Sequence, residues 1–425
     1  MAAYEREQSY RDPVHDFITL RQPLFLELVD TPEFQRLRRI RQLGASYGTY
    51  HGAEHSRFGH SLGALWIMTK ILDRFRNIGV VVDDLMVTVA RAAALLHDIG
   101  HGPFSHALEG LLTPGLTHED WTIRILLEPT AVHRALAKEH PQLPELVASV
   151  ISGDFTGPVF ISDLVSSQLD VDRMDYLLRD SLYTGVTYGQ FDLQRLINTL
   201  LVEGEQVVST AKGIGAVEEY LLARYFMYWQ VYLHKTTRSQ EVVLARMWQR
   251  AVDLWKDGRL REGNVPPTLL PLLQGRPGLG EYLAVDDHDV IYAAKVWAGA
   301  SDWILADLAR RFLERRLFKP VYKVHPTSIP RERLSEVAAL LVEEGWPPEY
   351  YLAVDDVSGA AYDLYEPELT GKRKKPILVL DEMGRPQEIT RLSPTMRALS
   401  MGPKVAVNIY VPETVVERAR KLLMA

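Results

Sequence analysis

Apolar residues recur every three to four positions along most of the chain before residue 320, which is the spacing of one helix face. This spacing predicts helices, and Ser, Thr, Asp, Gly and Pro residues mark several of their ends. The expected helices cover residues 30–44, 60–75, 83–98, 117–129, 160–180 and 217–255. A short strand or hairpin is expected earlier, at residues 12–20. The pattern therefore predicts a mainly α fold with a helical body over residues 1–319.

The pattern changes at Lys319. Short runs of β-branched and aromatic residues, such as 376–380 and 404–412, follow one another with two helical segments at 331–345 and 412–424. We interpret residues 320–425 as a smaller α+β unit that packs on the helical body.

Composition narrows the choice of partners and compartment. The chain has 425 residues, 47% of them apolar, which is enough for one large core or two domains. A formal net charge of −7 argues against extended nucleic acid as a partner, since no basic block follows a phosphate backbone. The N-terminus lacks an apolar signal core, and no uncharged run reaches membrane length. We expect a cytoplasmic protein without a membrane partner.

The chain has no cysteine, which excludes disulfides, thiolate metal ligands and thiol nucleophiles. A bound metal must therefore be held by histidine and carboxylate side chains. Seven of the 13 histidines fall between His51 and His118. This stretch is where the sequence concentrates its chemistry.

The adjacent pair His97-Asp98 ends an apolar run and offers one imidazole and one carboxylate at the end of a buried helix. His60 opens the helix before it, and Asp172 lies on a later one. Together these residues supply two nitrogen and two oxygen donors. Such a set suits a divalent ion with open positions for water or phosphate, and we expect Mn, Fe, Zn, Ni or Mg.

Other histidines and arginines have simpler interpretations. A lone histidine on an apolar face is more often a core residue with satisfied hydrogen bonds than a metal ligand. We apply this ordinary interpretation to His51, His55, His133, His140, His288 and His325. Considered alone, the arginines of residues 30–44 likewise indicate a solvated helix face.

Six stretches of the chain resemble the HD-domain deoxynucleoside triphosphate triphosphohydrolases, the group that includes the SAMHD1-like enzymes and bacterial relatives. The stretches are residues 30–44, 55–63, 95–106, 117–120, 169–180 and 232–235. The likeness extends from about Asp12 to Lys319. Together the six stretches are far more specific evidence for this family than a His-Asp dipeptide alone. It implies an HD-domain helical core, whereas the C-terminal residues match less distinctly.

The resemblance implies a reaction and a set of roles. In such enzymes water attacks the α-phosphorus of a deoxynucleoside triphosphate (dNTP), the bond from that phosphorus to the 5′-oxygen breaks, and triphosphate is released as one unit beside the deoxynucleoside. The implied metal ligands are His60, His97, Asp98 and Asp172. The implied catalytic residues are His106 and His118 for proton transfer, Asp120 as a neighbour that orients His106, and His101 as a further candidate around the metal. Imidazole suits proton transfer because it titrates near neutral pH.

Substrate contacts are implied in the same way. The expected triphosphate clamps are Arg57, Arg173, Arg224 and Lys235. Arg224 and Lys235 are about three turns apart on the expected helix 217–255, so they should share one face. The implied sugar contacts are Gln42 and Asp180 to the 3′-hydroxyl, with Leu43, Tyr176 and Tyr232 packed around the ring.

The resemblance also implies regulation by assembly. Relatives form tetramers and bind activating nucleotides between subunits, so we expect a homotetramer, an activating GTP or dNTP, and magnesium on the nucleotide phosphates. The matching residues are Asp30, Gln35, Arg38, Arg195, Lys212, Arg315 and Lys319. Arg11 and Thr210 depart from the pattern of the relatives, which leaves the identity of the activator open.

Two other readings of the sequence stay open. HD folds also serve phosphohydrolases and phosphodiesterases of other nucleotide classes, because a fold does not fix its substrate. A catalytically idle nucleotide-sensing module is the non-enzymatic alternative. The intact ligand set and both site histidines argue for the enzyme.

Overall fold

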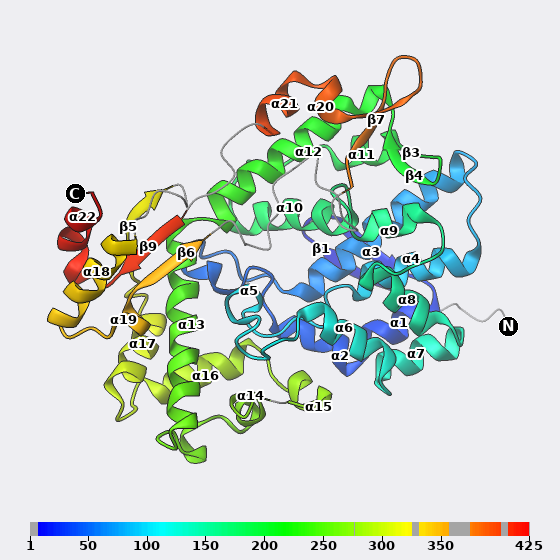
Figure 1. The fold of residues 1–425 in the computed structure, drawn as a ribbon. Coiled ribbons are helices and arrows are strands. Elements are labelled where there is room, and N and C mark those ends of the chain that lie inside the picture. Colours follow the sequence, from blue (N-terminus) through cyan, green and yellow to red (C-terminus); the bar gives the residue numbers. More distant parts are fainter. Residues whose placement is uncertain (1–6, 276, 325–330, 357–374, 401–406, 425) are drawn as a thin grey trace.

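The computed structural model describes residues 7–275, 277–324, 331–356, 375–400 and 407–424. Helices dominate these residues, and the strands form small sheets (Figure 1). The predicted mainly α fold with a smaller α+β region is confirmed. Within the described ranges, none of the helices combines the length and the apolar character that a membrane span needs.

Three helices lie at the centre of the body: α3 (Arg57–Asn77), α4 (Asp84–Leu96) and α10 (Val171–Thr184). Helix α3 packs against both of the others. Small residues allow this close approach, since α4 buries three successive alanines, residues 92–94, and α3 carries Gly63 where it meets α10. The polar residues at the ends of these helices are thereby brought together.

Two further groups of helices surround this centre. The first group packs on the same core and comprises α1 (Pro23–Val29), α2 (Pro32–Gln35), α6 (His118–Leu127), α7 (Ala131–Glu139), α8 (Leu143–Ser152), α9 (Val159–Val165), α11 (Leu193–Thr199) and α12 (Ile214–Met227). The second group has its own core around the long helix α13 (Lys235–Lys256). It comprises α5 (Ser105–Leu108), α14 (Leu270–Leu273), α16 (Asp287–Trp297) and α17 (Trp303–Leu313), whereas α15 (Leu279–Leu283) packs against the core of the first group.

The strands form three sheets. Strands β1 (Gln8–Asp12) and β2 (Asp16–Leu20) make an antiparallel hairpin, as residues 12–20 predict. The second sheet has the order β3-β4-β7-β8, from Leu200–Glu203, Gln206–Ser209, Leu378–Leu380 and Pro386–Glu388. The third has the order β5-β9-β6, from Lys319–Val324, Val407–Val411 and Ala353–Asp356.

The C-terminal residues are divided between two places. Strands β5, β9 and β6 pack with α18 (Arg331–Glu343), α19 (Pro348–Tyr351) and α22 (Val416–Met424) as a small α+β layer. Strand β7, however, pairs with β4, and α20 (Ile389–Leu392) and α21 (Pro394–Ser400) contribute to the core of the body. The division into residues 1–319 and 320–425 stays a prediction, and residues 375–400 pack with the body.

Three predicted helices are interrupted, so the prediction of single helices over these ranges is wrong. Residues 30–44 form α2 and a 3₁₀ turn, η1 (Arg36–Arg39), before Ile40 becomes extended. Residues 160–180 divide into α9 and α10, where the side chain of Asp170 caps α10. Residues 217–255 divide into α12, a π-helical turn (Tyr228–Tyr232) and α13, which His234 caps. In the last two breaks a polar side chain satisfies the backbone N–H groups that a new helix leaves unpaired.

Candidate metal centre and adjoining cavity

The four predicted metal ligands meet at the ends of the three central helices. His60 lies in the first turn of α3, His97 and Asp98 follow α4, and Asp172 opens α10. The Nε2 atoms of His60 and His97 are 3.2 Å apart. An oxygen of Asp172 lies 3.1 Å from the first nitrogen and 3.5 Å from the second. Ligand atoms around one divalent ion stand about 3 Å apart, since each bond is roughly 2.1 Å long.

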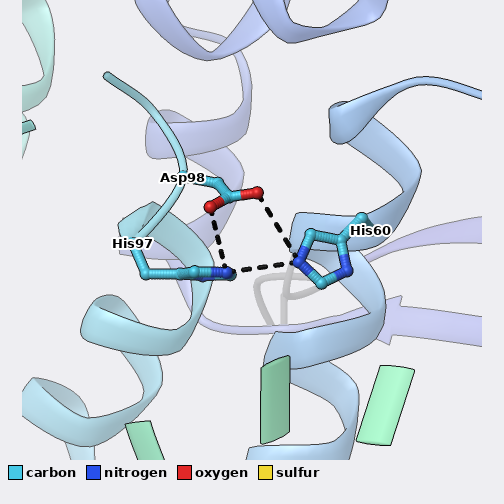
Figure 2. A group of neighbouring side chains, drawn as sticks. All are labelled: His60, His97 and Asp98. Carbon is cyan, nitrogen blue, oxygen red and sulfur yellow. Dashed lines mark hydrogen bonds and ion pairs between the residues drawn. The ribbon is translucent and has the colours of Figure 1, made fainter. Parts of the chain in front are cut away.

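The carboxylate of Asp98 faces the side-chain nitrogens of both histidines (Figure 2). Its oxygens lie 3.4 Å from His97 Nε2 and 3.7 Å from His60 Nε2. His60, His97 and Asp98 form a group whose ligand atoms could hold one metal ion. The ligand role of Asp172 stays a prediction that its distances favour.

Hydrogen bonds on the outer side of each histidine turn its Nε2 atom inward. His60 Nδ1 donates to Asp175 at 2.8 Å, and His97 Nδ1 donates to the carbonyl oxygen of Ala94 at 2.9 Å. Each neutral ring therefore directs a lone pair toward the point where the two carboxylates also converge. Four electron-pair donors repel one another unless a positive charge lies among them. The residues thus fit a divalent metal ion.

The acid–base properties of the site follow from this convergence. Burial lowers the pKa of His60, but hydrogen bonds with Asp172 and Asp175 outweigh it and raise that pKa to about 10. Burial raises the pKa of Asp172, yet its hydrogen bonds from both histidines bring that pKa far below the usual range. The form of His60 that binds a metal is the neutral ring, so a divalent ion competes with a proton for Nε2.

Charged and polar side chains also surround Asp98. Arg57, in the first turn of α3, donates to one of its oxygens, and His101 Nε2 lies 3.3 Å from the other. Burial and then the positive charge of Arg57 hold the pKa of His101 well below its usual value. His101 is therefore a neutral neighbour of the predicted ligand Asp98.

The predicted proton-transfer residues lie next to this group. The rings of His101 and His118 stack, with centroids 3.9 Å apart and planes within 10°. His118 Nδ1 is hydrogen-bonded to Glu109, which follows α5, at 2.6 Å. The side chain of His106 lies outside the described residues.

The carboxylate of Asp120 accepts from the backbone N–H of Thr117 at 2.7 Å and from the Thr117 hydroxyl at 2.8 Å. Asp120 therefore caps α6 and is exposed. Its expected role in orienting His106 stays a prediction, because the side chain of His106 lies outside the described residues. The carboxylate that holds His118 is that of Glu109, nine residues earlier in the chain.

A cavity of about 340 Å³ opens beside these groups. The predicted substrate residues that line it are Gln42, Leu43, Arg57, Arg173, Tyr176 and Asp180. Tyr232 lies just behind, where its hydroxyl donates to Asp180 at 2.8 Å. Lys235 is exposed and lies outside this lining, and the break between α12 and α13 removes the argument that it shares a helix face with Arg224.

One part of the cavity wall is rich in buried positive charge. Arg173 and Arg224 lie close to Tyr176, and burial together with the positive charge of Arg173 lowers the pKa of Arg224. The Nε atoms of Arg57 and Arg173 are buried without a hydrogen-bond partner in the described part of the chain. Unsatisfied guanidinium donors are costly in a protein interior, and phosphate oxygens are their natural acceptors.

The predicted activator residues lie elsewhere. Gln35 donates to the carbonyl oxygen of Val29 at 2.8 Å and accepts from Arg38 at 2.9 Å. Asp30 lines a separate cavity of about 730 Å³ between α1 and α7. The other predicted activator residues are exposed: Arg195, Lys212, Arg315 and Lys319. A site between subunits needs more than one chain, so these assignments stay predictions.

The sequence does not predict several residues that hold the site from behind. Asp175 fixes His60, Glu109 fixes His118, and His55 lies 2.7 Å from Asp180. The interpretation of His55 as an ordinary core histidine leaves out this last contact. The sequence contains one indication for Asp175: it follows Asp172 by three residues, so both side chains lie near the same face of a helix.

Known proteins agree with this architecture. The family model described as "HD domain" matches residues 57–180, and that described as "HD associated region" matches residues 191–262. The chain is 40% identical over 413 residues to the uncharacterized protein YwfO of Bacillus subtilis, which covers 96% of this chain and 93% of that protein. A crystal structure of a phosphohydrolase from Bacteroides thetaiotaomicron superposes with a TM-score of 0.83 at 31% identity, covering 96% of this chain and all of that one.

More distant relatives carry a named activity. The SAMHD1 homolog of Dictyostelium discoideum, a deoxynucleoside triphosphate triphosphohydrolase, is 33% identical over 241 residues. This match covers 53% of the present chain and 46% of that protein. The chain therefore belongs to the HD-domain family, and the SAMHD1 enzymes are among its relatives.

Proposed function

We propose that this HD-domain protein is a metal-dependent triphosphohydrolase that cleaves dNTPs to deoxynucleoside and inorganic triphosphate. One observation carries the proposal: the converging metal ligands and the buried guanidinium groups open onto the same cavity. Its volume of about 340 Å³ lies within the range of small-molecule sites. The relationship to SAMHD1 supports the choice of dNTP as substrate.

The arginines would neutralise the triphosphate. A triphosphate carries about four negative charges, which must be balanced before a nucleophile can approach phosphorus. Arg57 and Arg173 line the cavity and have buried Nε–H groups ready to donate to phosphate oxygens. A divalent ion held by His60, His97, Asp98 and Asp172 would polarise the phosphoryl group and activate water.

Proton transfer is assigned to the stacked histidines. The leaving oxygen needs a proton near neutral pH, and His118 lines the cavity with its Nδ1 fixed by Glu109. This leaves the other ring nitrogen, Nε2, for the substrate. His106, by sequence, is the second proton-transfer residue, and neutral His101 packs against His118.

The sugar end of the cavity favours a deoxyribose. The Oε1 atom of Gln42 is buried without a hydrogen-bond partner in the described residues, so a sugar hydroxyl would satisfy it. Asp180 is fixed in the wall by His55 and Tyr232 and offers a second acceptor. Leu43 and Tyr176 supply apolar surface, against which an additional 2′-hydroxyl would lose its hydrogen bonds with water.

Product analysis tests the proposal. The purified chain is loaded with Mn²⁺ and incubated with each of the four dNTPs, with and without GTP. We expect deoxynucleoside and inorganic triphosphate as the products. Monophosphate with pyrophosphate would indicate cleavage of another bond of the triphosphate and favour a different HD-type phosphohydrolase. Absence of any product, with metal bound, would support the nucleotide-sensing alternative.

The reactions with and without GTP also test the predicted activator. Light scattering in the presence of nucleotide tests the predicted tetramer.

A further inference from the structure

A buried network of charged side chains lies behind His60, on the side away from the cavity. Its centre is the carboxylate of Asp175 on α10, which is fully buried. One oxygen accepts from His60 Nδ1 and from Arg179 Nε, both at 2.8 Å. The other lies 2.6 Å from His15 Nε2 and 2.9 Å from Arg179 Nη2. A carboxylate has about four acceptor sites, so Asp175 is saturated and held in one orientation.

The N-terminal hairpin supplies the outer part of this network. His15 lies in the turn between β1 and β2, 160 residues before its partner Asp175. Its ring stacks on Trp66 of α3 with centroids 4.5 Å apart. Asp12, at the end of β1, accepts from Arg179 at 2.9 Å and from the backbone N–H of His15 at 2.9 Å. The hairpin therefore fixes both His15 and Arg179 against the central helices.

The network also depends on the close contact of α3 with α10. A Cβ atom on Gly63 would lie 1.8 Å from an oxygen of Asp175 and 2.6 Å from Arg179 Nη2. Gly63 stands three residues after His60, which puts it near the same face of α3. The carboxylate thus fits behind His60 only because position 63 has no side chain.

We propose that Asp175 is a positioning residue for the metal ligand His60, and that the hairpin residue His15 keeps Asp175 in place. The inference rests on the proposed metal centre and adds a part of the chain outside the motifs to it. A carboxylate bonded to Nδ1 fixes the tautomer in which Nε2 carries the lone pair, and its negative charge makes that nitrogen a stronger ligand. Because Asp12 and Arg179 neutralise each other, one negative charge remains behind the ring.

The test measures Mn²⁺ affinity of the full chain by titration calorimetry, so it does not depend on any substrate. Asp175→Asn retains the size of the side chain but replaces an acceptor by a donor that faces His15 or Arg179. We expect Mn²⁺ to bind about 10- to 100-fold more weakly, the usual effect of losing such a partner. The matched control is Asp302→Asn, which breaks a comparable pair with Arg250, at 3.0 and 2.6 Å, away from the site. This control should lower the melting temperature and leave Mn²⁺ affinity unchanged.

A second variant covers the case in which Asp175→Asn does not fold. His15→Phe can preserve the stack on Trp66 and removes the hydrogen bond to Asp175, so a smaller loss of Mn²⁺ affinity is expected, about 3- to 10-fold.

Wild-type affinity in both variants would overturn the inference. So would equal losses in Asp302→Asn, because they would reflect general destabilisation. A wild-type chain that binds none of Mn²⁺, Fe²⁺, Zn²⁺, Ni²⁺ and Mg²⁺ refutes the metal centre and this inference together. One that binds Mn²⁺ but cleaves no dNTP refutes only the proposed reaction.

Discussion

The two sides of the cavity are built differently. On the metal side His60 is completely buried, and the group that fixes its Nδ1, Asp175, is itself buried and held by Arg179 and His15. On the proton-transfer side the His118 side chain is 27% exposed, and so is that of its partner Glu109. Glu109 follows the four-residue helix α5, whereas Asp175 lies within a helix of 14 residues.

This difference suits the two tasks that we propose for the two sides. A metal ligand must keep its position within a fraction of an ångström, so it gains from helices and from several layers of hydrogen bonds. A proton-transfer group must exchange protons with solvent or substrate, so partial exposure and a single orienting partner suit it. Variants on the two sides should therefore separate metal binding from turnover.

The largest effect is expected on the metal side. Asp172→Ala removes an oxygen that lies 3.1 Å from His60 Nε2 and leaves the two imidazoles without this carboxylate. Metal content, measured by mass spectrometry, should fall to background, and dNTP hydrolysis should fall by about 10³-fold or more. A variant that retains its metal would remove Asp172 from the ligand set.

On the opposite side, His118→Ala should have the reverse pattern. Loss of a proton-transfer group lowers kcat by about 10²- to 10⁴-fold, while the metal ligands keep their hydrogen bonds and hence their ion. Metal content and kcat are measured on the same preparation. His106→Ala is expected to behave in the same way. If either variant loses its metal, the two sides are not independent and the comparison fails.

Substitutions in a third part of the cavity wall should affect substrate binding rather than metal binding. Arg173→Ala removes a buried guanidinium group next to Arg224, and kcat/KM for dNTPs should fall by about 10- to 100-fold at unchanged metal content. Arg173→Lys should recover part of the loss, since it restores the charge but not the planar geometry. Equal kinetics of all three proteins would contradict the phosphate role.

The smallest effect concerns stability as a function of pH. Burial raises the pKa of Glu109, but its hydrogen bond with His118 outweighs burial and holds that pKa below the ordinary 4.5. A folded pKa below the unfolded value stabilises the protein above pH 4.5, and the gain is lost as pH falls further. Wild type should therefore melt a few degrees above Glu109→Gln at pH 7, and the difference should shrink below pH 4.5. A difference that does not change with pH would mean that the carboxylate charge does not matter.

The sequence alone predicts the central helices α3 and α4 and the His60, His97 and Asp98 group beside them. Helix α4 follows from its apolar run, and the Thr31 and Thr117 caps follow from side chains that can accept the backbone N–H groups at a helix start. The mainly α fold follows from periodicity, which is a local property. Histidine and acidic residues next to such helices then suggest a metal site, because a buried imidazole or carboxylate needs a hydrogen-bond partner or a metal ion.

Only the tertiary structure decides what stands behind those residues. The carboxylate that fixes His118 is that of Glu109, nine residues earlier, whereas Asp120 caps its own helix. His15 meets Asp175 across 160 residues, and no spacing along the chain encodes such a contact. Helix breaks at Asp170 and His234 are likewise decided by competition between a side-chain cap and the continuing helix. Periodicity in the sequence indicates which face of a helix or strand is buried. Which residue contacts that face depends on how closely two backbones approach, as α3 and α10 do at Gly63.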